Sequence, residues 1–108
     1  MKMYGIHNCD TVRRAKKFLE SHSIVFEFVD YRKNPLDKKE LLEIVSTVGW
    51  DKIINKRSIT YRNLEDSVKQ QIGIEVLVDN PTLIKRPILV VGSKILVGYN
   101  EDEYLKLI

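Results

Sequence analysis

Residues 3–31 read MYGIHNCDTVRRAKKFLESHSIVFEFVDY and contain two apolar segments separated by a helical pattern. The first segment, Met3 to Ile6, is a short apolar run that predicts a buried strand. Apolar residues then recur at helical spacing over 12–19. Ile24 to Tyr31 is rich in Val and Phe, which predicts a second strand. The stretch therefore predicts a β-α-β unit, whose strands are normally parallel and joined by a right-handed crossover.

Residues 36–80 read as a helical insertion. Asp37 and Glu40 have the spacing of a capping box at the start of a helix, and Gly49 fits the end of that helix. Leu41, Leu42, Val45 and Val48 are the apolar positions expected to form the buried face of that helix. Leu64, Val68 and Ile72 are spaced i, i+4 and i+8, which predicts another helix over 64–72, ended by Gly73. Residues 74–79 fit either a helix or a strand.

The last part of the chain predicts a β-hairpin followed by a helix. Ile88 to Val91 and Lys94 to Val97 flank Gly92-Ser93, a short turn of the kind that joins antiparallel strands. Asn100 fits the start of the final helix. A parallel strand pair followed by a hairpin is the strand arrangement of a thioredoxin-like sheet. The sequence thus predicts a single α/β domain of this fold over 1–108, interrupted by the inserted helices.

Composition limits the classes of protein to consider. The chain has 108 residues, of which 44% are hydrophobic, enough for one domain with its own core. Apolar runs are too short to span a bilayer and the N-terminus lacks the pattern of a secretory signal, so we expect a cytoplasmic protein without a membrane partner. The net charge of +3 is mild and acidic residues are interleaved, so we expect a mixed surface and no direct nucleic-acid binding. The expected oligomeric state is a monomer.

Cys9 is the only cysteine and lies between the first predicted strand and the first predicted helix. An intramolecular disulfide is therefore excluded, and Cys9 with His7 would make a poor metal site, so no metal is expected. Free N–H groups and the positive dipole end of the helix favour a thiolate at this position, with Arg13 one turn further on. The alternative is a small buried cysteine without chemistry.

Other polar residues near the predicted site allow two interpretations each. His7 either acts as a base or cation near the thiol or points away from it, and Asn8 either forms the turn or contacts an anion. Arg86 precedes Pro87 at the start of the third strand. A cis bond there would let the backbone pair with an extended thiol substrate beside Arg86. On the sequence alone, a trans proline with a solvated arginine is the commoner state.

Three separated segments carry a resemblance to a known family. They are 4–15 (YGIHNCDTVRRA), 54–62 (INKRSITYR) and 80–90 (NPTLIKRPILV). Together, in this order and spacing, they resemble the arsenate reductase-related family, which has a thioredoxin-like fold and includes the Spx/MgsR-type regulators. The chain most resembles the small bacterial arsenate reductase-like proteins proposed to be glutathione-dependent thiol reductases.

The resemblance implies roles for particular residues. Cys9 would be the redox-active nucleophile, Arg86 would contact an oxyanion or glutathione, and Pro87 would be cis. Arg13 matches the arginine that follows the family's cysteine motif. Together with Asn8, these arginines would stabilise the thiolate or bind glutathione.

The sequence also departs from the family pattern. An arginine of the family's insertion aligns with Asn55, which leaves Arg57 two positions away as the candidate for that role. Residues 98–101 supply no third arginine, and arsenate needs a matched set of donors. Val12 stands where many regulators have the second cysteine of a Cys-x-x-Cys switch. These differences place arsenate reduction in doubt and exclude an internal thiol switch.

The sequence and the resemblance therefore predict a monothiol oxidoreductase. Glutathione would be the co-substrate that resolves the mixed disulfide or covalent adduct at Cys9, and no bound cofactor is expected. One alternative is a regulator of the Spx/MgsR type that binds the α subunit of RNA polymerase. A further alternative is an arsenate reductase proper.

Overall fold

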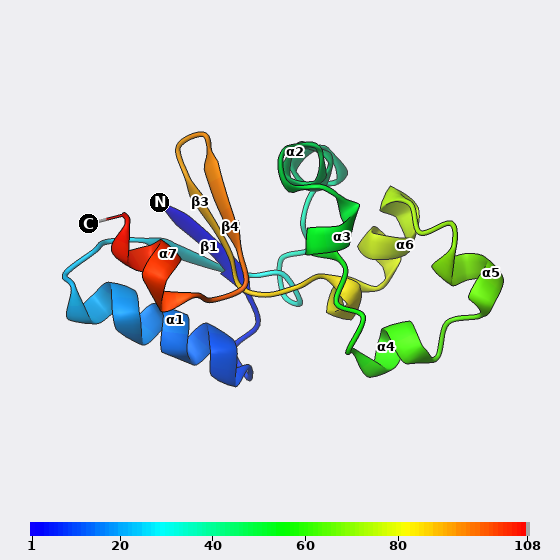
Figure 1. Ribbon diagram of the computed structural model, residues 1–108, viewed down its shortest axis with the longest axis horizontal. Coiled ribbons are helices and arrows are strands. Elements are labelled where there is room, and N and C mark those ends of the chain that lie inside the picture. The colour runs from blue at the N-terminus through cyan, green and yellow to red at the C-terminus, as the bar shows by residue number, and fades with distance from the viewer. Residues whose placement is uncertain (108) are drawn as a thin grey trace. The chain divides into compact units, whose positions relative to one another are not determined.

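The computed structural model describes residues 1–107 and shows a chain of mixed helices and strands (Figure 1). Two compact units are present. The first consists of Met1–Asn34 together with the segment from Arg86 onward, and the second is Pro35–Lys85. Because the first unit contains both ends of the chain, the second is an insertion between its two halves.

The first unit is built on a four-stranded sheet in the order β2-β1-β3-β4. The strands are β1 (Lys2–Gly5), β2 (Glu27–Asp30), β3 (Ile88–Val91) and β4 (Lys94–Val97). β1 runs parallel to β2 and antiparallel to β3, and β3 and β4 form the hairpin. The predicted thioredoxin-like arrangement is confirmed, although β2 is shorter than the apolar run from Ile24 suggested.

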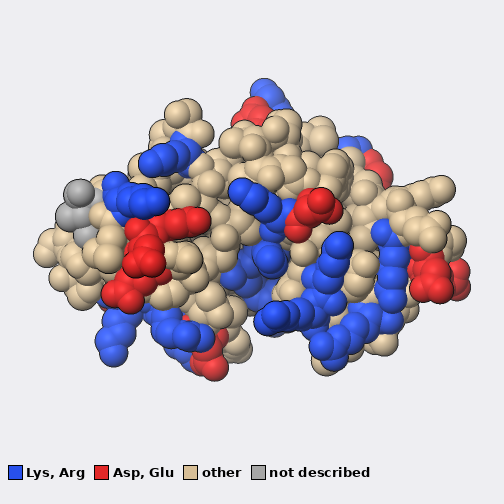
Figure 2. Space-filling view, in the orientation of Figure 1, with Lys and Arg blue, Asp and Glu red and all other residues tan. Residues whose placement is uncertain are grey.

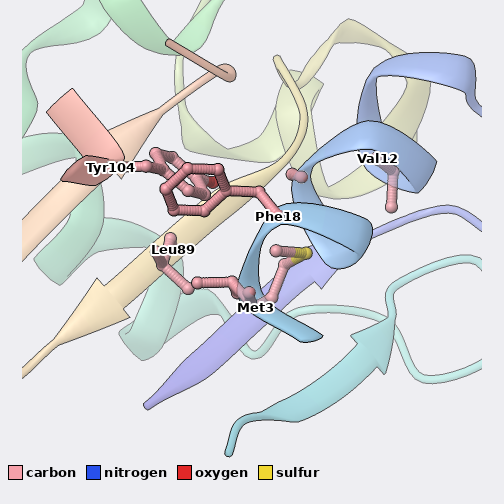
Figure 3. Packing of buried hydrophobic residues seen from close by; sticks show 7 residues of the cluster. Met3, Val12, Phe18, Leu89 and Tyr104 are labelled. Atoms are coloured by element: carbon pink, nitrogen blue, oxygen red, sulfur yellow. The ribbon is translucent and has the colours of Figure 1, made fainter. Parts of the chain in front are cut away.

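Two helices pack on one face of this sheet, α1 (Asp10–Ser21) and α7 (Glu101–Leu105). Figure 3 shows Phe18 of α1 and Tyr104 of α7 meeting above Met3 and Leu89 of the strands. The Phe18 and Tyr104 rings meet edge to face, with centroids 5.7 Å apart, a favoured aromatic geometry. The predicted apolar face of α1 is confirmed, because its buried residues are Val12, Ala15, Phe18 and Leu19. Burial of large apolar side chains contributes about 1.5–3 kcal/mol each.

Gly5 permits a close approach between α1 and the sheet. A Cβ atom at this position would lie 3.0 Å from Cγ2 of Val12 and 3.3 Å from Cε1 of Phe28. The absence of a side chain on Gly5 therefore lets the first turn of α1 rest directly on the end of β1. Since Cys9 begins that turn, this contact helps to fix the position of the thiol.

The second unit consists of short helices. They are α2 (Lys38–Val48), α3 (Trp50–Ile53), α4 (Ile59–Arg62), α5 (Asp66–Lys69), α6 (Ile74–Asp79) and the 3-10 helix η1 (Pro81–Leu83). Asp37 caps α2 by accepting a hydrogen bond from the Lys39 N–H (3.4 Å), as its capping position predicted. Gly49 ends α2 with a φ of 88°, which a residue without a side chain adopts easily.

Two expectations for the second unit were wrong in part. Leu42 is 46% exposed, because the buried stripe of α2 runs through Leu41, Ile44 and Val45 instead. This i, i+3, i+4 spacing leaves the next residue after Leu41 on the solvent side. The helix expected over 64–72 is reduced to α5. The ambiguous residues 74–79 form α6.

The surface carries both signs of charge on the face shown in Figure 2, as expected from interleaved acidic and basic residues. Within residues 1–107, no helix is long and apolar enough to cross a membrane.

Candidate active site

Cys9 lies directly between β1 and α1, as predicted. It is the N-cap residue of α1, with an extended backbone (φ −124°, ψ 123°), and its carbonyl oxygen accepts the Arg13 N–H at 3.0 Å. The N–H groups of the first helical turn have no carbonyl partner within the helix. Those of Thr11 and Val12 donate to the Cys9 sulfur. The start of α1 is thus arranged around the thiol.

Arg86 reaches the same sulfur from the other half of the first unit. It precedes β3 and is joined to Pro87 by a cis peptide bond, as the family resemblance implied. The Arg86 side chain is partly buried and donates a hydrogen bond to the Cys9 sulfur. The structure thus places Arg86 against the thiol, while the oxyanion- or glutathione-binding role that the resemblance gave it stays a prediction.

The surroundings of Cys9 favour the thiolate. Partial burial raises the pKa of the thiol, but the hydrogen bonds from the Val12 N–H, from Arg86 and from the Thr11 N–H lower it, as does the positive charge of Arg86. The lowering effects win, so the pKa of Cys9 lies below its usual value. A lower pKa increases the fraction of nucleophilic thiolate at neutral pH.

Tyr31 is a member of the site that the sequence analysis missed. Its side chain is only 1% exposed, and its backbone N–H donates to the Gly5 carbonyl at 3.1 Å, directly after β2. The Tyr31 hydroxyl oxygen accepts a hydrogen bond from Arg86. Burial raises the pKa of Tyr31, so the phenol stays neutral at physiological pH. The sequence pattern places Tyr31 only at the end of an apolar strand.

Asp30 and His7 form a second polar pair beside the Cys9 loop. The carboxylate of Asp30, in a residue only 7% exposed, lies 3.6 Å from Nε2 of His7 and accepts the His7 backbone N–H at 3.4 Å. It also accepts the Arg32 N–H at 2.9 Å. Burial raises the pKa of Asp30, but these N–H donors and the nearby His7 charge outweigh burial and hold the pKa below its usual value.

The remaining predicted residues lie in different surroundings. Arg13 is exposed and pairs with Asp10 on the same face of α1, and it is not among the groups that lower the pKa of Cys9. Asn8 is exposed in the turn before Cys9. Arg57 belongs to the second unit, where its N–H donates to Oδ1 of Asn55 at 3.1 Å. Roles for Arg13, Asn8 and Arg57 therefore stay predictions.

Residues 1–107 contain no group of three or more His, Cys, Asp or Glu side chains placed to hold a metal ion. The donors gathered at Cys9 are instead backbone N–H groups and a guanidinium. This set suits a negatively charged sulfur or oxygen.

Known proteins share both the sequence and the fold. Residues 4–107 match the ArsC family. An uncharacterized protein from Haemophilus influenzae is 47% identical over 106 residues, covering 94% of this chain and 93% of that protein. The regulatory protein MgsR from Bacillus subtilis is 36% identical over 113 residues, covering 99% and 89%. The solved structure of the YffB protein has a TM-score of 0.91 at 32% identity, covering 97% and 96%. As the three quoted segments predicted, this chain belongs to the ArsC family.

Proposed function

We propose that this protein is a monothiol oxidoreductase that uses Cys9 as its nucleophile and glutathione as its co-substrate. The observation that carries the proposal is the contact between Arg86 and the Cys9 sulfur at the start of α1. A cysteine surrounded only by apolar groups has a raised pKa and is inert. Here a guanidinium and two backbone N–H groups are aimed at the sulfur, which is an arrangement that stabilises a thiolate.

The reaction proceeds through two thiol–disulfide exchanges. The Cys9 thiolate attacks one sulfur of a disulfide formed between glutathione and a second thiol. A Cys9–glutathione disulfide forms, and the second thiol leaves as a thiolate that takes a proton from water. Glutathione thiolate then attacks the glutathione sulfur of that bond, releasing Cys9 thiolate and glutathione disulfide. The second thiol is thus released in reduced form and one free glutathione is consumed, because the glutathione disulfide that forms joins that molecule to the glutathionyl group of the substrate.

The residues around Cys9 have distinct tasks in this scheme. Arg86 and the first turn of α1 stabilise the sulfur when it is negatively charged, both before attack and as the leaving group of the second exchange. Tyr31 holds Arg86 in place from the β2 side. An external thiol is required because Cys9 has no second cysteine to resolve its disulfide. The reduced glutathione pool of the cytoplasm would supply that thiol.

The test is formation and resolution of a Cys9–glutathione disulfide. We expect the reduced protein to gain one glutathionyl group on incubation with glutathione disulfide, as seen by intact-protein mass spectrometry, and to lose it with excess glutathione. Cys9→Ser is the blank. Absence of the adduct in the wild-type protein would overturn the proposal. Arsenate added to the same assay tests the further possibility of arsenate reduction.

A regulatory function is the second candidate, because MgsR is similar to this chain over nearly its whole length. In this case the protein would act by binding the α subunit of RNA polymerase rather than by turnover. Purified α subunit captured by the immobilised protein, with equal capture by Cys9→Ser, would favour the regulator. Failure to capture the subunit would leave the enzyme as the remaining proposal.

A further inference from the structure

A cavity of about 380 Å³ lies next to the Cys9 loop within the first unit. It is lined by Ile6, His7, Asn8, Asp30, Arg32 and Lys33. Its size is at the lower end of the range of small-molecule sites, about 300–1,000 Å³. Neither Cys9 nor Arg86 lines this cavity. The cavity is therefore distinct from the contact between these two residues.

The cavity is formed by residues 6–8, which lie between β1 and α1, and by residues at the end of β2 and directly after it. Asn8 directly precedes Cys9, so their Cα atoms are about 3.8 Å apart. Asp30 and Arg32 flank Tyr31, whose hydroxyl binds Arg86. A ligand in the cavity therefore lies beside the segments that hold the nucleophile and its guanidinium partner.

The charge that the cavity offers to a ligand is positive. The carboxylate of Asp30 is already engaged by the Arg32 N–H (2.9 Å) and by the N–H and Nε2 of His7 (3.4 and 3.6 Å). The side chains of Arg32 and Lys33 are exposed, and neither has an ion-pair partner within the described part of the chain, 1–107. The side chains of Arg32 and Lys33, together with the Asn8 amide, can therefore donate hydrogen bonds to a ligand.

We propose that this cavity binds a carboxylate of the small thiol or disulfide whose sulfur reacts at Cys9. This proposal rests on the proposed function and specifies its substrate class as low-molecular-weight thiols that bear a carboxylate. Arg32 can hold a carboxylate through two parallel N–H bonds, and Lys33 adds a point charge. Because the carboxylate is held there, Arg86 remains available to stabilise the sulfur.

Selectivity follows from this division of tasks. A thiol with a carboxylate is held by the cavity while its sulfur meets Cys9, whereas an uncharged thiol meets Cys9 by collision alone. Holding the reacting groups together lowers the entropic part of the barrier. Arg32 and Lys33 are thus expected to set the preference between charged and uncharged substrates and to leave the intrinsic reactivity of Cys9 unchanged.

Binding of S-methylglutathione, followed by NMR, tests the cavity without any reaction at Cys9. The methylated sulfur cannot exchange, so amide shifts report binding alone. We expect saturable shifts at the N–H groups of Asn8, Arg32 and Lys33. The double variant R32A/K33A should weaken the affinity about fivefold or more, which corresponds to ~1 kcal/mol. It keeps both backbone N–H groups, including the donor to Asp30.

The matched control removes two positive charges elsewhere. Lys17 and Lys94 are exposed on α1 and β4, and K17A/K94A should bind S-methylglutathione as the wild-type protein does. The dimethyl ester of the ligand should bind weakly to all three proteins. Equal affinities of the two double variants, or shifts absent from the cavity amides, would overturn the proposal.

Failure of the cavity proposal is distinguishable from failure of the proposed function. Exchange with hydroxyethyl disulfide, which is uncharged, reports on Cys9 alone. R32A/K33A should react with this disulfide at the wild-type rate and with glutathione disulfide several-fold more slowly. A Cys9 that reacts with neither disulfide in the wild-type protein contradicts the proposed function, while the S-methylglutathione titration still decides whether the cavity binds carboxylates.

Discussion

The side chain of Arg86 donates a hydrogen bond to the sulfur of Cys9, although the helical second unit separates the two residues in the sequence. The sheet explains why they meet. β1 and β3 are antiparallel neighbours with Tyr4 opposite Ile88. The residues that follow β1 and those that precede β3 therefore lie at the same end of this strand pair. The pairing of two central strands therefore sets the contact.

Replacement of Arg86 by Gln should raise the pKa of Cys9 toward the free value of about 8.5. The variant removes both the positive charge and its hydrogen bond, while burial, which raises the pKa, remains. The thiolate's ultraviolet absorbance, followed against pH, measures the shift. Exchange with glutathione disulfide at neutral pH should slow by several-fold to about tenfold, because fewer molecules carry the thiolate.

Arg14→Gln is the control for Arg86→Gln. Arg14 is exposed on α1 and is not among the groups that shift the pKa of Cys9. An equal rise of the pKa in both variants would show that net charge, rather than the contact from Arg86, governs the thiol.

Tyr31→Phe should reduce the stabilisation of the Cys9 thiolate without removing a charge. The hydroxyl of Tyr31 accepts a hydrogen bond from Arg86, and the ring itself is buried and would stay in place. Without this partner, Arg86 is held less firmly against the sulfur. We expect the pKa of Cys9 to rise by less than in Arg86→Gln and the exchange rate to fall by a few-fold.

Tyr61→Phe, in the second unit, provides the matched control for Tyr31→Phe. It should leave both the pKa of Cys9 and its exchange rate unchanged. A Tyr31→Phe protein with the wild-type pKa and rate would mean that the hydroxyl does not position Arg86.

Asp30→Asn should lower the free energy of unfolding at neutral pH and alter how that free energy varies with pH. In the folded protein, burial raises the pKa of Asp30, but the N–H donors of Arg32 and His7 hold it below its usual value. A carboxyl with a lowered pKa stabilises the fold above its unfolded pKa of about 3.9, and this contribution is lost as the pH falls through the folded pKa. In the variant, the side-chain NH₂ of the asparagine would also face one of the backbone N–H donors, and two donors cannot form a hydrogen bond with each other.

Urea unfolding at several pH values measures the effect of Asp30→Asn. We expect the free energy of unfolding to fall by about 1–3 kcal/mol at pH 7, and the gap to the wild-type protein to shrink in acid. Asp79→Asn, at an exposed position at the end of α6, should show almost no gap. If the difference in unfolding free energy between Asp30→Asn and the wild-type protein did not change with pH, the ionised carboxylate would be excluded as its cause.

The sequence was sufficient to predict the sheet and the place of Cys9, because these depend on local patterns. The apolar run at Met3 and the turn at Gly92-Ser93 each define a strand or a hairpin within a few residues. Strand and helix patterns on either side of Cys9 put it at a helix start, where free N–H groups favour a thiolate.

Other features of the site depend on contacts that local patterns cannot show. Tyr31 and Asp30 were missed because their roles arise only when β2 is placed beside β1. Arg13 was expected near the thiol from its distance along α1, but its side chain pairs with Asp10 instead. The cis state of Pro87 came from the family resemblance, since neighbouring residues alone favour trans.

Tyr104→Phe should stabilise the protein. The ring of Tyr104 is fully buried, and its hydroxyl has no hydrogen-bond partner within residues 1–107. A buried hydroxyl without a partner costs about 1–3 kcal/mol, whereas the ring contact with Phe18 survives in the variant. We expect a higher midpoint of thermal unfolding, measured by circular dichroism. A lower midpoint would show that the hydroxyl is satisfied in solution.

Gly5→Ala should destabilise the protein and disturb the thiol, because α1 rests directly on β1 at this point. The added Cβ would lie 3.0 Å from Cγ2 of Val12, so either the helix or its side chain must shift. Overpacking of this kind costs about 1–3 kcal/mol. Displacement of the first turn would also misdirect the N–H groups that lower the pKa of Cys9.

Gly73→Ala is the matched control for Gly5→Ala. A Cβ at Gly73 would meet no atom within 4 Å, and its backbone is extended, with φ −112°, so the substitution should be neutral or stabilise by up to about 1 kcal/mol. Urea unfolding and thiol titration of both variants separate local crowding from a general effect of losing glycine. If Gly5→Ala kept the wild-type stability and thiol pKa, then Val12 and Phe28 would have room to yield, and the position of Cys9 would not depend on this contact.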